Sequence, residues 1–340
     1  MAEEINIQTK HTIEKQTAHY VDCFTTVSEI TNNECRELLD KPADVVLMNG
    51  FEDDFVPKGA TFTGKRKRAR STMLRVANCL LGEDLGDDTL IIGTSGRYEF
   101  KNKGIDVFLE SLNRLNRDKD LKKKVLAFVN VPSWVGDPRE DLQKRLKSKD
   151  KFTEPLQCPF ITHWLHNMTH DQVLDMLKYL GMGNRPEDKV KVIFVPCYQD
   201  GHDGILNKHY YDLILGEDLS VYPSYYEPWG YTPLESVAFR VPTITTDLAG
   251  FGLWVNSLKN QHGINDGVEV LHRSDYNYSE VADGIKDTVA LFSTKTEAEI
   301  KEIRKRAGQV AEQALWKLFI QNYYEAYDIA LRNAMKRQLK

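Results

Sequence analysis

The most constraining feature of the sequence is a strand–turn–helix–strand pattern between Val221 and Phe251. The apolar run at Leu219–Tyr222 predicts a short buried strand, and Val241–Thr246 predicts a second one. Between them, Thr232 and Pro233 predict a helix start, because threonine is a good N-cap and proline suits the first helical position. A β–α–β unit of this kind belongs to a parallel sheet, so the pattern predicts an α/β fold.

The turn inside this pattern has the chemistry of a ligand site. Gly230 permits close approach of the backbone, and the helix start behind it offers free N–H groups and a positive dipole end, which suit a phosphate. Two carboxylates, Glu227 and Glu235, flank the turn eight residues apart. Glutamate usually faces water, but aromatic residues crowd Glu227. They are Tyr225, Tyr226, Trp229 and Tyr231.

Short apolar runs recur along the chain with helical patterns between most of them, which predicts a Rossmann-like parallel sheet. The predicted strands are Thr89–Gly93, Val125–Val131, Val190–Pro196, Leu219–Pro223, Val241–Thr246 and Val268–Leu271. Ligands of such sheets bind beyond the carboxyl ends of the strands. Arg97 and Lys103 follow the first strand in the run GTSGRYEFKNKG. An arginine fork and a lysine point charge both suit phosphate oxygens.

Two of these runs carry a family resemblance. SYYEPWGYTP followed by Glu235, together with GRYEFKNKG, resembles the glycogen synthases of animal and fungal type, and the chain looks like a shorter bacterial-type member. The resemblance implies a retaining glycosyltransferase of the GT-B fold, built from two Rossmann-like domains. It implies transfer of glucose from UDP-glucose to the 4-OH end of an α-1,4-glucan such as glycogen. No cofactor and no metal are implied.

The resemblance also assigns roles to residues. As catalytic groups it implies Arg97 and Lys103, which hold the diphosphate, and Glu227, which faces the sugar. For nucleotide-sugar binding it implies a further set, in which Glu235 grips the ribose and Tyr210 stacks on uracil. That set is Glu235, Tyr210, Trp229, Gly230, Tyr231 and Thr232. Whether His11 or Lys15 replaces two further family residues stays open.

Three regions are predicted. Residues 1–75 are expected to be a remnant of the N-terminal, acceptor-side domain with the junction, because two helices (Thr12–Tyr20 and Ser28–Leu39) and two strands (Cys23–Val27 and Val45–Met48) do not easily cover both faces of a parallel sheet. Residues 76–294 are expected to form the complete nucleotide-sugar domain, and residues 295–340 to form helices that cross back. Whether Met1 is a genuine start or a truncation stays open.

Composition argues against several classes of protein. The net charge of −5 gives no attraction to nucleic acid, and the basic run KRKRAR is expected to be a solvated helix face. No apolar run reaches the length of a membrane span, and the start shows no secretory pattern. Five scattered cysteines fit a reduced, cytoplasmic protein. His163, His166 and His170 lack further ligands, so we expect no metal site.

Several alternatives remain. The chain is also consistent with another retaining glucosyltransferase of the same fold, or with a truncated nucleotide-sugar-binding module that has no transferase activity. Whether the chain prefers UDP-glucose or ADP-glucose stays open, as does whether it forms a homo-oligomer. In the family, an arginine cluster on the tail receives glucose 6-phosphate. Only Arg304, Lys305 and Arg306 stand there, so we expect no response to that sugar phosphate.

Overall fold

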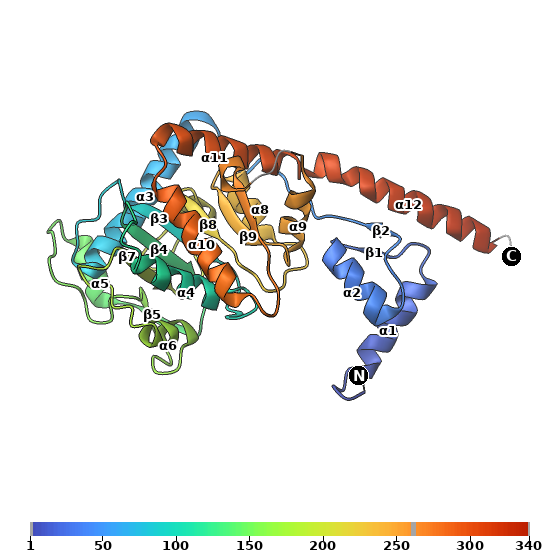
Figure 1. The fold of residues 1–340 in the computed structure, drawn as a ribbon, viewed down its shortest axis with the longest axis horizontal. Coiled ribbons are helices and arrows are strands. Elements are labelled where there is room, and N and C mark those ends of the chain that lie inside the picture. Colours follow the sequence, from blue (N-terminus) through green and yellow to red (C-terminus); the bar gives the residue numbers. More distant parts are fainter. Residues whose placement is uncertain (1–2, 260–262, 339–340) are drawn as a thin grey trace.

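A six-stranded parallel sheet forms the centre of the larger part of the molecule (Figure 1). The computed structural model describes residues 3–259 and 263–338. The strand order of the sheet is β10-β9-β8-β3-β4-β7, and each neighbouring pair is parallel. The strands are β3 (Leu90–Ser95), β4 (Val125–Asn130), β7 (Val190–Val195), β8 (Leu219–Val221), β9 (Thr243–Thr246) and β10 (Val268–Leu271). The α/β fold with six strands is therefore confirmed, each end lying within two residues of its predicted position.

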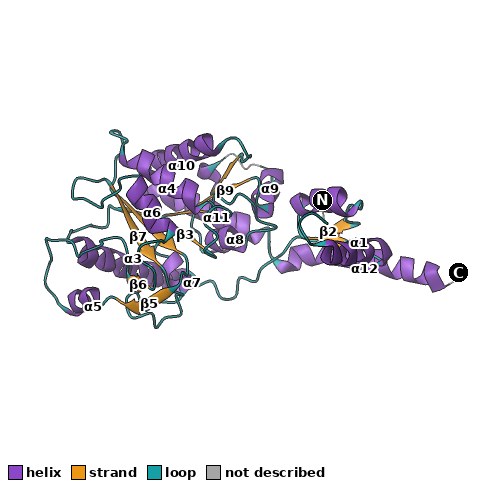
Figure 2. Ribbon diagram, turned by 90° about the horizontal axis from the view of Figure 1, so that it is seen from below, coloured by secondary structure: helices purple, strands orange, loops and turns teal. Residues whose placement is uncertain are grey.

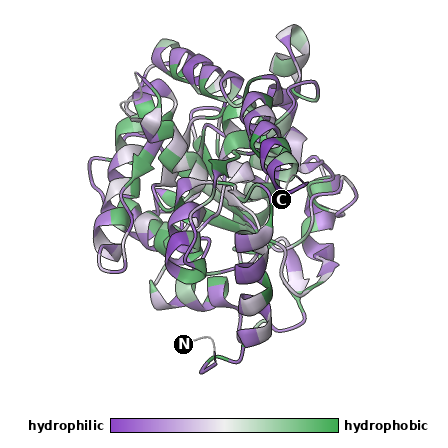
Figure 3. Ribbon diagram, turned by 90° about the vertical axis from the view of Figure 1, so that its right-hand side faces the viewer, coloured by the Kyte–Doolittle hydropathy of each residue, from purple (hydrophilic) through white to green (hydrophobic). Residues whose placement is uncertain are grey.

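Helices cover both faces of this sheet, so most residues of its strands are buried, polar ones such as Lys191 and Thr245 included. One core layer joins the sheet to α4 (Ile105–Asn116), α6 (Gln172–Tyr179) and α10 (Tyr278–Ser293). The other joins it to α3 (Gly59–Leu81), α5 (Glu140–Lys147) and α7 (Tyr210–Ile214). Figure 3 shows the hydrophobic residues gathered on the inner strands and the hydrophilic ones on the outer faces of the helices.

The order of the strands places a crevice at their carboxyl ends. From β3 the chain moves outward through β4 and β7, and then returns to the other side of β3 as β8, β9 and β10. The direction of winding thus reverses between β3 and β8. Open α/β sheets bind ligands at such a switch point, beyond the carboxyl ends of the strands.

A second core lies beside β9 and β10. It is formed by α8 (Tyr231–Ala238), α9 (Gly250–Ser257), α11 (Glu297–Glu312) and the start of α12 (Trp316–Gln338). The short helix η1 (Ile264–Asp266) precedes β10, and β5 (Val135–Pro138) pairs with β6 (His163–Leu165) in a small antiparallel sheet. The predicted helical tail is therefore two helices, which are separated near Leu315.

The N-terminal unit is small and stands apart from the large sheet (Figures 1 and 2). It contains α1 (Gln8–Tyr20), β1 (Thr25–Thr26), α2 (Glu29–Leu39) and β2 (Val45–Val46). Ser28 caps α2 in a capping box with Thr31. Both predicted strands are two residues long in the structure, and they pair with each other in a two-stranded parallel sheet. The helix α12 runs from the large part to this unit (Figure 1).

Two predictions about the junction need correction. The predicted boundary between residues 75 and 76 falls inside α3, a continuous helix that packs on the large sheet. KRKRAR, at residues 65–70, is not wholly a solvated face. Arg66 and Arg70 each form a 2.7 Å ion pair with Asp218, and their side chains are only 22% and 14% exposed. Their partner lies far away in sequence, so no local pattern signals it.

None of the helices within the described ranges combines the length and apolar character that a bilayer crossing requires.

Candidate functional site

Two predicted catalytic residues meet at the switch point. Lys103 lies in the loop after β3, and Glu227 lies in the turn after β8. The Lys103 Nζ atom forms an ion pair and hydrogen bond with Oε2 of Glu227. Their side chains are only 17% and 19% exposed, so water screens the pair weakly. The structure thus joins residues that the sequence separates widely.

The turn that carries Glu227 is braced against the loop after β9. Glu227 N–H donates to the Leu248 carbonyl (3.1 Å), and Gly250 N–H donates to the Glu227 carbonyl (3.0 Å). The Thr246 hydroxyl also donates to the Ser224 carbonyl (2.7 Å). These bonds hold the carboxylate in place through its own backbone.

The helix start behind the turn differs from its prediction by two residues. α8 begins at Tyr231, and the N-cap position is Gly230, with φ 108° and no side-chain cap. Thr232 therefore lies in the first turn of the helix instead of capping it. The positive φ is one that glycine adopts readily. Because no side chain caps this end, its backbone N–H groups remain open to an anion.

A cavity of about 350 Å³ lies beyond the carboxyl ends of β3 and β4. Two of its residues, Tyr210 and Ser95, are linked through their hydroxyls at 3.0 Å, and burial raises the pKa of the Tyr210 phenol. Its lining is Ser95, Gly96, Arg97, Tyr98, Asn130, Pro132, Cys197, Tyr198, Gln199, Tyr210 and Thr232. A mainly apolar hollow with a few polar groups has the character of a nucleobase pocket.

Arg97 stands at this cavity with an exposed side chain. The side chain is 76% exposed, and its guanidinium lies 3.0 Å from the Glu99 carboxylate. A surface ion pair of this type is weak. Arg97 can therefore turn toward a ligand at little cost.

Glu235 lies in the first turns of α8, where Tyr211 O–H donates to it at 2.8 Å. Burial raises the pKa of this carboxyl, and the Tyr211 bond opposes the shift. Tyr211 is itself stacked on Phe239, with ring centroids 5.4 Å apart. Tyr211 was not among the predicted site residues, although it stands next to Tyr210 in the sequence.

Trp229 and Tyr231 take opposite positions. The Trp229 side chain is 3% exposed and packs in the core against Phe251, Trp254 and Phe319. The Trp229 backbone carbonyl accepts a hydrogen bond from Phe251 N–H at 2.6 Å. Tyr231, by contrast, is 46% exposed at the start of α8.

The two open positions of the N-terminal unit are engaged elsewhere. His11 Nε2 lies 2.7 Å from the Leu38 carbonyl, and Lys15 pairs with Asp40. Both contacts fasten α1 to the end of α2. They assign neither residue to the site.

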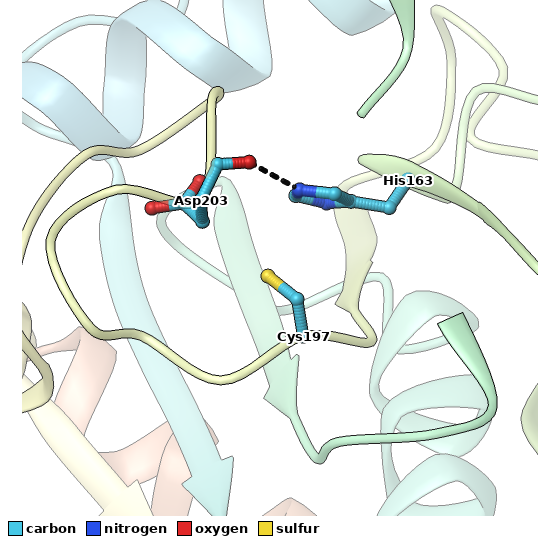
Figure 4. Close-up of side chains that lie close together, drawn as sticks. All are labelled: His163, Cys197 and Asp203. Carbon is cyan, nitrogen blue, oxygen red and sulfur yellow. Dashed lines mark hydrogen bonds between the residues drawn. The ribbon is translucent and has the colours of Figure 1, made fainter. Parts of the chain in front are cut away.

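Sequence reasoning missed a group of side chains that could offer atoms to a metal: His163, Cys197 and Asp203 (Figure 4). His163 Nε2 lies 2.7 Å from the Asp203 backbone carbonyl, and its Nδ1 lies 2.9 Å from the Thr162 hydroxyl. The Asp203 carboxylate accepts three backbone N–H groups, and burial raises the pKa of the Cys197 thiol to about 12. These atoms already serve the local fold, and the expectation of no metal site stays a prediction.

Solved structures show which fold the chain has. The glycosyltransferase WaaG, of lipopolysaccharide biosynthesis, superposes with a TM-score of 0.51 at 14% identity, covering 90% of this chain and 62% of its own. The Anabaena protein Alr3699/HepE, solved with UDP and glucose, superposes with a TM-score of 0.52 at 16% identity, covering 97% and 67%. At such identity the likeness shows the fold, which is that of the GT-B glycosyltransferases.

The family follows from the sequence comparisons. The family model for glycogen synthase matches residues 1–139 and 141–340, so the chain belongs to the glycogen synthase family. The glycogen [starch] synthase of Neurospora crassa is 28% identical over 96% of this chain. Isoform 2 of Saccharomyces cerevisiae is 29% identical over 100% of it. The chain spans 54% and 57% of the lengths of these two relatives.

Proposed function

We propose that the chain binds UDP-glucose at the switch point and serves a retaining transfer of glucose to the 4-OH end of an α-1,4-glucan such as glycogen. The observation that carries the proposal is the Lys103–Glu227 contact between the loops after β3 and β8. It stands beside the uncapped start of α8. Family membership, and relatives that are named glycogen [starch] synthases, support the substrate class.

In this proposal the base occupies the cavity lined by Tyr210, and Glu235 holds the ribose. Lys103, Arg97 and the first N–H groups of α8 face the diphosphate. They oppose the negative charge that grows on the leaving group, and preorganised electrostatic help of this kind is usually the largest catalytic contribution. Glu227 faces the sugar and stabilises positive charge at the anomeric carbon.

The cations of the proposed reaction are side chains, so it requires no cofactor and no metal. We propose a cytoplasmic setting, where nucleotide sugars and glucans would be the partners. A binding module without transfer remains the alternative, because the chain spans only about half of its relatives. Incorporation of labelled glucose into glycogen by a fusion of this chain with the N-terminal domain of a relative separates the two, because the purified chain alone is expected to bind the donor without transfer.

Calorimetric titration with UDP-glucose tests donor binding directly. Lys103→Ala should weaken binding about tenfold or more, since it removes a charged hydrogen-bond donor. The matched control is Lys101→Ala, two residues earlier in the same loop and exposed, which should leave the affinity unchanged. No heat from wild type at millimolar UDP-glucose would refute the proposal, as would equal affinity of the Lys103 and Lys101 variants.

A further inference from the structure

Three loops at the carboxyl edge of the sheet meet at Tyr225. Its backbone N–H donates to the carbonyl of Asn102 at 2.8 Å, in the loop after β3. Its hydroxyl donates to the carboxylate of Asp275, in the loop after β10. Its ring faces the guanidinium of Arg273, whose central carbon lies 5.6 Å from the ring centroid. Tyr225 itself belongs to the turn after β8.

Arg273 is an unusual residue for a loop. It is only 6% exposed, and its guanidinium lies between two aromatic rings, those of Tyr225 and Tyr278, the second at 5.5 Å. Within the part of the chain that the structure describes, its Nε and Nη1 atoms have no hydrogen-bond partner. Cation–π attraction offsets part of the cost of burying this charge. The two rings therefore constrain the position of the buried Arg273 side chain.

Carboxylates surround this contact without pairing with the two buried nitrogens. Arg273 donates to Asp247 through its backbone N–H, at 2.8 Å, while His272 takes the other oxygen of Asp247. The charge of Arg273 also acts on Asp106, at the start of α4. The guanidinium therefore holds its place between the rings, and the acids fix the loop around it.

The contact lies directly behind the proposed donor site. Asn102 immediately precedes Lys103, and Tyr225 stands two residues before Glu227. The backbone bond between Asn102 and Tyr225 therefore runs alongside the Lys103–Glu227 ion pair. Movement of the loop after β10 would therefore loosen the Asn102–Tyr225 hydrogen bond and the Lys103–Glu227 ion pair together.

We infer that Tyr225, Arg273 and Asp275 form a clamp that positions Lys103 and Glu227 for the diphosphate and sugar of the donor. They are positioning residues, and the inference rests on the proposed function. None of the three is among the residues that line the cavity assigned to the base. The clamp should therefore affect the sugar-diphosphate half of a ligand and spare the nucleoside half.

The test compares UDP-glucose with UMP, which lacks the β-phosphate and the sugar, by calorimetric titration of the full chain. Tyr225→Phe keeps the ring but loses the bond to Asp275. It should weaken the binding of UDP-glucose about 3- to 10-fold, as expected for the loss of one hydrogen bond to a charged group. The affinity for UMP should stay within about twofold of wild type. Arg273→Met should act more strongly than Arg273→Lys, because lysine keeps a cation over the rings.

Two further variants sharpen the test. Tyr276→Phe makes the same chemical change one residue from Asp275, on a side chain that is 93% exposed, and should bind both ligands like wild type. The double variant Tyr225→Phe with Asp275→Ala should bind UDP-glucose no more weakly than the weaker-binding of the two single variants. The reason is that both changes remove the same hydrogen bond.

Each other outcome overturns the clamp. Unchanged UDP-glucose affinity in Tyr225→Phe and Arg273→Met would show that the contact does not position the site. Equal weakening of UDP-glucose and UMP, with a lower unfolding midpoint, would show a merely structural role. If wild type binds neither ligand, the proposed function fails and the clamp fails with it.

Discussion

Replacing Glu217 with glutamine should stabilise the protein at neutral pH. Glu217 follows α7 and is 4% exposed, with the Ser220 hydroxyl donating to it at 2.7 Å. Burial, with a smaller contribution from Asp218, raises the pKa of its carboxyl from 4.5 to about 8, although the Ser220 bond opposes the shift. The folded protein thus keeps a proton that the unfolded chain has lost above about pH 4.5.

The sign of the effect follows from that difference. Between pH 4.5 and 8 the unfolded state binds fewer protons at this position, so stability falls as pH rises. The slope is about 1.4 kcal/mol per pH unit, and by pH 7 the loss amounts to about 3 kcal/mol. Glutamine has nearly the same shape, stays neutral, and its carbonyl can still accept from Ser220.

The assay is guanidinium unfolding of wild type and Glu217→Gln at several pH values from 5 to 8, followed by near-ultraviolet circular dichroism. The two proteins should have similar free energies of unfolding near pH 5. As pH rises, the variant should become more stable than wild type. Glu312→Gln, on the exposed face of α11, is the matched control and should show no such gain. A constant stability difference across the pH range would refute the reasoning, because it would mean that Glu217 is ionised in the fold.

Four further outcomes are expected. Arg97→Ala should weaken UDP binding by about 1–3 kcal/mol, and an unchanged calorimetric affinity would remove Arg97 from the site. Gly230→Ala should weaken UDP-glucose binding severely, because its φ of 108° strains an alanine; wild-type affinity would show that the helix start does not hold the ligand. Glucose 6-phosphate should leave UDP affinity unchanged, because only Arg304, Lys305 and Arg306 stand where the family has its arginine cluster, and a clear shift in a competition titration would contradict this. The purified chain should not incorporate labelled glucose into glycogen, because its N-terminal sheet has only two two-residue strands among the described residues; incorporation that Glu227→Ala abolishes would show a sufficient acceptor side.

The parts of the fold that the sequence predicts are those with strong local patterns. β4 and β7 are apolar except for Lys191 and the terminal Asn130, and both were predicted nearly to their ends. The Lys103–Glu227 contact was not predicted. The family motif implied only that both residues belong to one site, since no periodicity links a loop after β3 to one after β8.

The features that sequence reasoning missed depend on distant partners. Trp229 is buried because α12 brings Phe319 against it, and no local pattern shows that. Arg273 lies between Tyr225 and Tyr278 because β8 and β10 end at one edge of the sheet. The basic run of α3 was predicted to be solvated because Asp218, its partner, follows more than a hundred residues later.

The ion pair at the switch point has a consequence for the timing of the proposed reaction. An incoming diphosphate competes with Glu227 for Lys103, so part of the binding free energy is used to part the two side chains. In the proposed reaction, once the lysine has moved, the carboxylate would stand without its counter-ion beside the anomeric carbon. The negative charge of Glu227 would therefore be available to the anomeric carbon only while a donor is bound. In the empty site, Lys103 neutralises that charge.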